Sequence, residues 1–202
     1  MLESTKSVIE SSLLAQIKES RDVKQRILDK PACLQSVQSA CDLALTCYQK
    51  GGKLLIAGNG GSAADAQHIA GELVSRFFFD RPSLPAIALT TDSSIITAIG
   101  NDYGYEYLFS RQIEGNGQQG DLFLAITTSG NSPNILEGIA AAKKKNMQVI
   151  GLTGEKGGKM ADLCDVCIKI PSTVTPRIQE GHILVGHLLC DFIERSMFTP
   201  EK

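Results

Sequence analysis

Short apolar runs alternate with longer helical stretches along most of this chain. The runs lie at 53–57, 85–89, 121–126, 148–152 and 166–170, and their apolar side chains occupy consecutive positions. Consecutive apolar positions are typical of strands that are buried on both faces of a parallel sheet. Such strands, alternating with helices through right-handed crossovers, form a doubly wound sandwich of three layers. We therefore predict an α/β fold with a five-stranded parallel sheet.

Two helical stretches, 5–29 and 33–50, precede the first predicted strand. An apolar stripe runs among the charges of the first one, formed by Val8, Leu13, Leu14, Ile17, Val23, Ile27 and Leu28. The pair suits an oligomerisation element, or it packs on the sheet of its own chain. We predict one domain over residues 1–202, with this helical pair at 1–50, an α/β core at 51–202 and a last helix at 176–198.

Composition narrows the class of protein. The 202 residues suffice for one well-cored domain. Lys and Arg number 20 against 22 Asp and Glu, which argues against electrostatic binding of nucleic acid or membranes. The N-terminus lacks a basic segment followed by an apolar core, and apolar runs fall short of the ~20 residues that span a bilayer. The expected location is the cytoplasm.

The six cysteines agree with that location. Only Cys164 and Cys167 have a spacing used for metal or redox chemistry, and no second ligand pair accompanies them. Because this pair lies in a segment with the pattern of a strand, we expect structural cysteines and no zinc ribbon.

A glycine-rich turn, Gly58-Asn59-Gly60-Gly61-Ser62, connects the first apolar run to an Ala-rich helical stretch. Glycines let the backbone turn sharply and bring its N–H groups close to a ligand, and Ser62 is expected to cap the helix. Within that helix His68 and Glu72 are four residues apart and so share one face. The turn is not G-x-G-x-x-G, which argues against a dinucleotide site.

A second polar turn, residues 127–134, also connects a strand to a helix. Its hydroxyl side chains are those of Thr127, Thr128, Ser129 and Ser132. Hydroxyls at a helix N-terminus suit a phosphate group, and the absence of a Walker loop argues against nucleotide hydrolysis. Either turn alone fits a capped, hydrated turn, but two at one sheet edge favour a phosphorylated small molecule. A third polar stretch contains Asn101 and Asp102. Two interpretations stay open for it: contact with sugar hydroxyls, or capping of helices.

The final helix carries Gln179 and His187, eight residues apart. A lone histidine among apolar neighbours is commonly a core residue, and this alternative stays open for His187. If this helix packs beside the helix that bears His68 and Glu72, all four residues form a set of nitrogen and oxygen donors suited to zinc.

Several motifs together resemble those of a known family. They are Gly58-Asn59-Gly60-Gly61-Ser62, Asp65-Ala66-Gln67-His68 with Glu72, Arg81–Leu89, Gly100-Asn101-Asp102, Thr128-Ser129-Gly130-Asn131-Ser132, Leu152-Thr153-Gly154 with Gly157-Gly158, and Arg177-Ile178-Gln179-Glu180 with His187. On these residues the chain resembles the sugar isomerase (SIS) domain family, of flavodoxin-like fold, and within it the phosphoheptose isomerases. Thr127 stands where serine is common in that family, and Pro176 where some members have an acidic residue.

The resemblance implies a homotetrameric enzyme that converts sedoheptulose 7-phosphate into D-glycero-D-manno-heptose 7-phosphate, the entry step to lipopolysaccharide core heptose. It implies phosphate binding by Thr127, Thr128, Ser129 and Ser132, and substrate contacts by Asn59, Gly60, Gly61, Ser62, Glu72, Asn101, Asp102 and Gln179. It also implies one zinc ion per subunit, held by His68, Glu72, Gln179 and His187. Glu72 and His187 match the acid/base pair of an enediol mechanism.

Two other functions are compatible with the same motifs. A relative in this fold family is a tetrameric adaptor for the bacterial replication initiator, and its type of sequence is expected to lack the acid/base pair. The presence of Glu72 and His187 favours the isomerase. A module that only senses a sugar phosphate usually accompanies a DNA-binding or catalytic domain, which we do not expect here.

Overall fold

Five parallel strands form one sheet in the order β2-β1-β3-β4-β5. The computed structural model describes residues 2–199, and the side chains from residue 10 onward. The strands are β1 (Leu54–Gly58), β2 (Ala86–Ala88), β3 (Leu122–Ile126), β4 (Gln148–Gly154) and β5 (Val166–Ile170). All five predicted strands are confirmed, with ends that shift by at most two residues.

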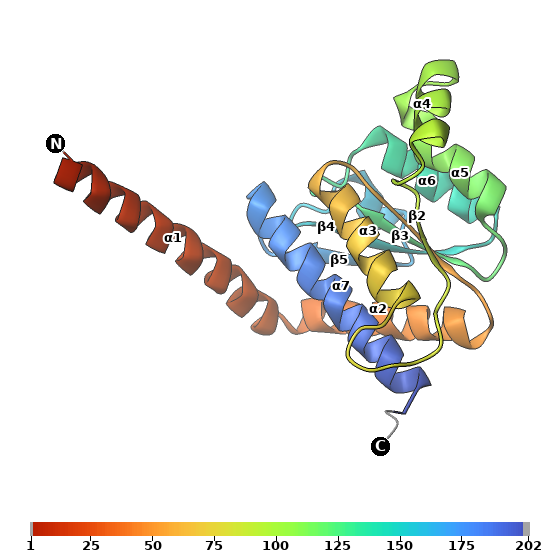
Figure 1. The fold of residues 1–202 in the computed structure, drawn as a ribbon, viewed down its shortest axis with the longest axis horizontal. Coiled ribbons are helices and arrows are strands. Elements are labelled where there is room, and N and C mark those ends of the chain that lie inside the picture. Colours follow the sequence, from red (N-terminus) through yellow and green to blue (C-terminus); the bar gives the residue numbers. More distant parts are fainter. Residues whose placement is uncertain (1, 200–202) are drawn as a thin grey trace.

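Helices cover both faces of the sheet, because alternate strand residues point to opposite sides. Leu54 and Ile56 belong to a core shared with α2 (Pro31–Gln49), α3 (Gly61–Val74) and α7 (Thr175–Met197). Leu55 and Ala57 belong to a second core shared with α4 (Ser93–Asp102), α5 (Leu108–Asn116) and α6 (Pro133–Lys144). Short 3-10 helices occur at η1 (Tyr105–Tyr107) and η2 (Lys159–Asp162). The predicted three-layer sandwich is confirmed (Figure 1).

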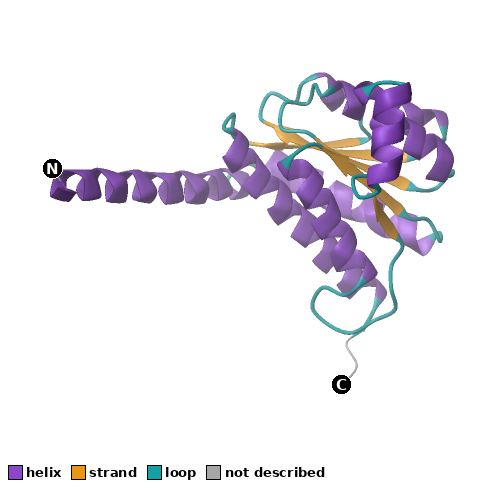
Figure 2. Cartoon of the chain, turned by 45° about the horizontal axis from the view of Figure 1, so that its top comes forward, coloured by secondary structure: helices purple, strands orange, loops and turns teal. Residues whose placement is uncertain are grey.

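The first helix, α1 (Leu2–Leu28), stands away from the body of the chain as a long arm (Figures 1 and 2). At its C-terminal end Val23 and Ile27 are buried in the first core. Further out, Leu13, Leu14 and Ile17 are exposed. The side chain of Val8 and the terminal residues 1 and 200–202 of the predicted domain lie outside the described residues. The apolar stripe of α1 is therefore only partly covered by its own chain.

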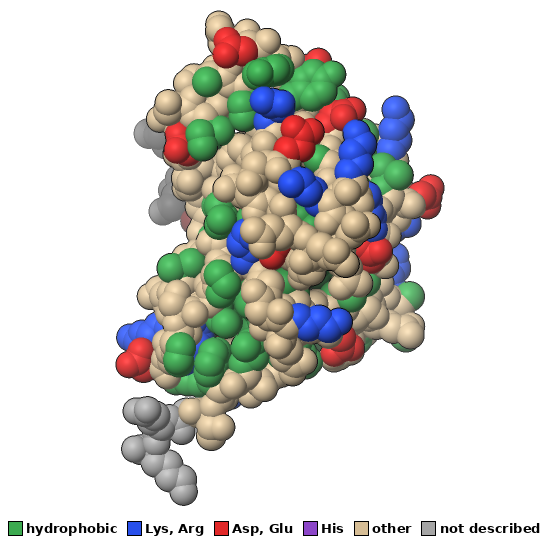
Figure 3. Space-filling view, turned by 90° about the vertical axis from the view of Figure 1, so that its right-hand side faces the viewer, with side chains coloured by type: hydrophobic (Ala, Val, Ile, Leu, Met, Phe, Trp, Pro, Cys, Tyr) green, Lys and Arg blue, Asp and Glu red, His purple; other side chains and the backbone are tan. Residues whose placement is uncertain are grey.

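The surface that carries α4 and α5 has basic and acidic side chains interspersed (Figure 3). All six cysteines are free thiols; Cys167 lies within β5 as predicted, whereas Cys164 lies in the bend before that strand. Among the described residues, none of the helices has the length and apolar character of a bilayer span.

The two polar turns follow β1 and β3, which are neighbours at the centre of the sheet. Since α3 leaves β1 for one face and α6 leaves β3 for the other, the strand order reverses at this point. Parallel α/β sheets bind their ligands in the crevice that such a reversal opens at the carboxyl ends of the strands.

Candidate active site

The glycine-rich turn brings the chain from β1 directly into α3. Gly60 adopts φ +57°, a left-handed conformation that glycine tolerates, and α3 begins at the next residue. The prediction that Ser62 caps this helix is wrong: Gly60 is the N-cap residue, and no side chain caps it. Ser62 lies inside the first turn and is buried, because the backbone turn is completed at Gly60.

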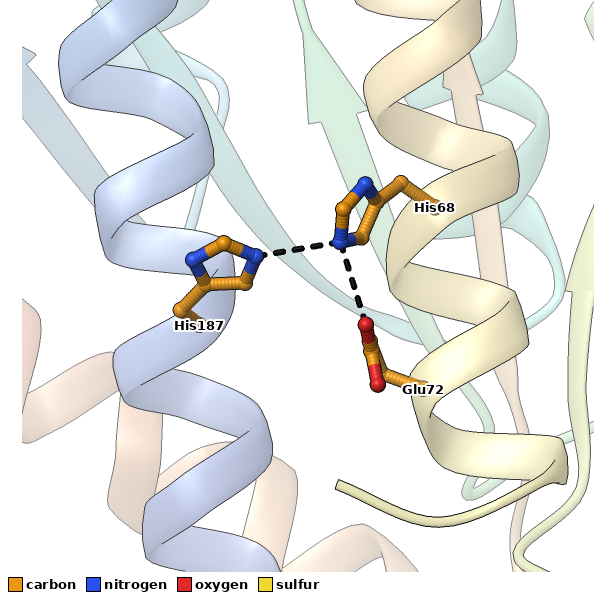
Figure 4. Close-up of side chains that lie close together, drawn as sticks. All are labelled: His68, Glu72 and His187. Atoms are coloured by element: carbon orange, nitrogen blue, oxygen red, sulfur yellow. Dashed lines mark hydrogen bonds and ion pairs between the residues drawn. The ribbon is translucent and has the colours of Figure 1, made fainter. Parts of the chain in front are cut away.

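Two helices bring His68, Glu72 and His187 together (Figure 4). On α3, the Nε2 atom of His68 lies 3.1 Å from Oε1 of Glu72. The same His68 Nε2 lies 3.1 Å from Nε2 of His187 on α7. The packing of α7 beside α3, on which the prediction depended, is therefore present. His187 points at His68 and is not a core histidine.

The donor set of this cluster matches what a divalent transition metal prefers. Two imidazole nitrogens and one carboxylate oxygen lie within 4.8 Å of one another. Zinc binds such nitrogen and oxygen ligands, and catalytic zinc sites commonly use three protein residues and leave one position for water or substrate. His68, Glu72 and His187 therefore fit a catalytic metal centre.

Gln179, the fourth predicted ligand, lies two helical turns before His187 on α7. Its amide group covers the glycine-rich turn, and a Cβ atom added to Gly61 would come within 2.5 Å of its Nε2 atom. Gln179 also lines a small cavity of about 80 Å³ with Asn59, Ser62, Ile126, Thr127, Thr128 and Ser132. The structure thus joins Gln179 to the predicted substrate residues.

The second polar turn converges its hydroxyls at the start of α6. Thr127 Oγ1 lies 2.8 Å from Ser132 Oγ and 3.4 Å from Ser129 Oγ. Ser132 is the N-cap residue of α6, and its hydroxyl bonds to Thr127 rather than to the helix. The first N–H groups of α6 therefore lack a side-chain cap, as expected of a helix end that binds an anion.

Close backbone packing fixes the shape of this turn. Gly130 has φ +68°, and a Cβ atom there would collide with the carbonyl oxygen of Gly157. The carbonyl of Gly130 accepts a hydrogen bond from the Met160 N–H at 3.0 Å. The loop that contains the predicted Gly157-Gly158 motif therefore packs against the second polar turn and fixes its shape.

Asn134 joins the two turns and was missed as a site residue in the sequence. It is buried at the start of α6, where its amide nitrogen donates to Asn59 Oδ1 at 2.8 Å, while the Asn59 amide donates back to Asn134 Oδ1 at 2.9 Å. The hydroxyl of Tyr105 also lies 3.0 Å from Asn59 Oδ1. Only the place of Asn134 within the second turn hinted at this role, and nothing local pointed to Tyr105.

Asn101 and Asp102 stand apart from this group. Both are exposed at the C-terminal end of α4, where the Asn101 amide donates to the Asp102 carboxylate at 2.8 Å. Within the described residues, no hydrogen bond or ion pair connects them to the other candidates. Their contact with substrate stays a prediction.

Comparison with known proteins gives one consistent result. The sequence profile of the SIS domain family matches residues 17–154. A phosphoheptose isomerase from Aneurinibacillus thermoaerophilus is 58% identical over 182 residues, which are 90% of this chain and 92% of that protein. One from Burkholderia pseudomallei (strain 1710b) is 55% identical over 92% of this chain and 94% of its own length. The solved structure of a phosphoheptose isomerase from Neisseria gonorrhoeae superimposes with a TM-score of 0.86, at 44% identity over 92% of this chain and 98% of the other.

Proposed function

Because the chain belongs to the phosphoheptose isomerases of the SIS domain family, we propose that it interconverts sedoheptulose 7-phosphate and D-glycero-D-manno-heptose 7-phosphate. The observation that carries this proposal is the convergence of Glu72 and His187 from two helices beside a polar cavity. Both helices reach that cavity, α3 through Ser62 and α7 through Gln179.

The distance between cavity and cluster supports a long sugar phosphate. Ser62 and His68 are six residues apart on α3, which corresponds to roughly 9 Å along the helix axis, and the Glu72 carboxylate reaches back to within 3.1 Å of His68 Nε2. An open-chain heptose 7-phosphate carries its phosphate at one end and its reacting carbons, C1 and C2, at the other. Such a molecule can place its phosphate among the hydroxyls of the second turn and its carbonyl near Glu72.

Each predicted binding residue has a role in this arrangement. The hydroxyls of Thr127, Thr128, Ser129 and Ser132, together with the first N–H groups of α6, bind the phosphate. Sugar hydroxyls meet the first turn and α7, through Asn59, Gly60, Gly61, Ser62 and Gln179. Asn101 and Asp102 complete the proposed set.

Glu72 and His187 carry the proton transfers. Starting from the ketose, the Glu72 carboxylate removes a proton from C1, and the electron pair forms the C1–C2 double bond of an enediolate. The imidazole of His187 moves a proton from the C1 oxygen to the C2 oxygen, a task suited to a ring with one nitrogen that donates and one that accepts. Glu72 then returns its proton to C2, which yields the aldose.

A zinc ion, one per subunit, is part of the proposal. His68, Glu72 and His187 would hold it, with Gln179 as the fourth ligand implied by the family resemblance. When bound, it supplies a Lewis acid that stabilises negative charge on the enediolate oxygens. A carboxylate has two oxygens, so that Glu72 can contact a cation with one and accept a proton with the other.

We further propose that the subunits form a homotetramer and that the reaction supplies heptose for the lipopolysaccharide core. The exposed apolar side chains of Leu13, Leu14 and Ile17 on the arm α1 support self-association. Size-exclusion chromatography coupled to light scattering measures the molar mass of the assembly and so tests the tetramer. The cytoplasmic location stays a prediction.

Proton NMR in D₂O with sedoheptulose 7-phosphate tests the function. We expect a new anomeric signal of the aldose, with deuterium at C2 from exchange on the base. If a chelator abolishes this signal and added zinc restores it, the result would support a role of zinc in turnover. If the zinc-loaded protein gives no conversion, the isomerase proposal is wrong, and the adaptor function becomes the one to test.

A further inference from the structure

A buried ion pair joins α7 to the segment that follows α3, next to the elements that carry the acid/base cluster. Glu194 is on α7, seven residues and therefore about two turns after His187. Arg81 is in the loop that connects α3 to β2, and its Nε atom lies 3.0 Å from Glu194 Oε2. The side chains of Arg81 and Glu194 are 1% and 0% exposed. An ion pair so fully removed from water needs a complete set of partners.

The Glu194 carboxylate has that set. It accepts hydrogen bonds from the backbone N–H groups of Phe77, Phe78 and Phe79, at 2.8, 2.7 and 3.3 Å. These bonds and the Arg81 guanidinium hold the pKa of Glu194 below its usual range, although burial acts to raise it. A charged carboxylate on α7 thereby fixes the segment that follows α3.

Arg81 ties the same segment to the end of α3. Its Nη2 atom donates to the carbonyl oxygen of Glu72 at 2.9 Å, and its Nη1 atom donates to that of Leu73 at 2.8 Å. A cation at the C-terminus of a helix also interacts favourably with the helix dipole. The guanidinium therefore holds the backbone of one member of the acid/base pair.

Phe77 connects the ion pair to the other member. Its N–H group bonds to Glu194, and its ring centroid lies 5.6 Å from that of His187. The ion pair is thus linked to both members: Arg81 bonds to the backbone of Glu72, and Glu194 holds Phe77, whose ring contacts His187.

We propose that Arg81 and Glu194 are positioning residues, which set how Glu72 and His187 face each other across α3 and α7. A buried ion pair is often no more stabilising than an apolar pair of equal volume, so its stability alone does not account for it. Its directional bonds do fix the relative placement of the two helices. This inference rests on the roles of Glu72 and His187 in the proposed function.

Two substitutions test it. Arg81→Lys keeps the charge but loses the planar fork that reaches Glu194, Glu72 and Leu73 together. Glu194→Gln removes the charge with little change of shape. We expect each variant to lower kcat and the affinity for Zn²⁺ by about 10- to 100-fold, the size usual for groups that orient metal ligands. KM should change by less than about threefold, because the phosphate-binding turn is untouched.

Asp121→Asn is the matched control. Asp121 is also buried in an ion pair, 2.6 Å from Lys53 Nζ, and accepts N–H bonds from Lys53 and Gln118. It precedes β3, at the opposite end of the sheet from the site. We expect the Asp121→Asn protein to lose thermal stability but to keep the kcat and the Zn²⁺ affinity of the wild type.

Three readouts decide the outcome: NMR turnover, calorimetric titration with Zn²⁺, and thermal unfolding. If folded Arg81→Lys and Glu194→Gln proteins match Asp121→Asn in kcat and Zn²⁺ affinity, the positioning role is refuted. If neither folds, Phe77→Leu decides, since it removes the ring beside His187 and keeps the N–H bond; unchanged kcat and affinity would refute the role. A wild type without turnover refutes the proposed function instead, and the Zn²⁺ titrations still test the positioning.

Discussion

The Nε2 atoms of His68 and His187 lie 3.1 Å apart, although 119 positions separate these residues in the sequence. Glu72 completes the group through the same His68 nitrogen. Two nitrogens and one oxygen thus converge where α3 and α7 pack together.

Replacing His68 by Ala is expected to weaken Zn²⁺ binding by at least about 100-fold, because one of three converging donors is lost. Isothermal titration of protein freed of metal by a chelator measures this. Gln67→Ala is the control, since Gln67 is exposed on the same helix and bonds to Thr90. Equal affinities for both variants would remove His68 from the metal site.

Glu72→Gln is expected to lower kcat by about 10²–10⁴-fold, because an amide cannot serve as the base. The substrate should still raise the melting temperature of the variant, since the phosphate-binding turn is intact. Turnover at the wild-type rate would exclude Glu72 from the proton transfer.

Ser129→Ala and Ser132→Ala are expected mainly to raise KM, because the proposed function places their hydroxyls against the phosphate, which does not react. Each loses a hydrogen bond worth about 1.5–3 kcal/mol to a charged group, which corresponds to roughly 10- to 150-fold in KM. The control is Ser36→Ala, whose exposed hydroxyl bonds only within α2. An unchanged KM in both site variants would contradict the phosphate assignment.

Asn134→Asp is expected to raise KM and lower stability by about 1–3 kcal/mol. A carboxylate cannot donate to Asn59 Oδ1, so the reciprocal amide pair between the two turns is lost at a buried position. Denaturant unfolding and steady-state kinetics measure the two effects. Full stability together with an unchanged KM would show that the pair has no role in joining the turns.

Stability is expected to fall between pH 6.5 and about 4, because burial lowers the pKa of His182 over that range. The unfolded chain takes up a proton below its ordinary pKa and the folded chain does not, so that acid favours unfolding. The full effect is about 3 kcal/mol, since one pKa unit corresponds to ~1.4 kcal/mol.

His182→Gln serves as the comparison for this pH effect. Unfolding by denaturant at about pH 7 and pH 5 should show a smaller loss of stability in the variant than in the wild type. Equal losses would show that His182 does not cause the pH dependence.

Much of the fold was predictable because local patterns determine it. Consecutive apolar residues, such as Leu54 to Ala57, predict a strand buried on both faces, and both cores indeed take residues from it. The shared face of His68 and Glu72 followed from helical periodicity alone. Their contact with His187 was conditional, since periodicity does not say which helices pack together.

The features that were missed depend on contacts between distant segments. The Arg81–Glu194 pair joins residues 113 positions apart, and Tyr105 reaches Asn59 across 46. A sequence pattern shows a charged residue in a loop or on a helix, but not that folding buries it. The wrong prediction for Ser62 has a local cause, because Gly60 already completes the turn at which a cap was expected.

In the proposed mode of binding, helix α3 sets the length of substrate that the site accepts. Its first turn borders the cavity proposed for the phosphate and its second half carries His68 and Glu72, so a rigid rise of about 1.5 Å per residue sets the distance between the two. A sugar phosphate with fewer carbons, held by the same hydroxyls, would stop short of Glu72. Discrimination by chain length would then need no residue that recognises the missing carbon.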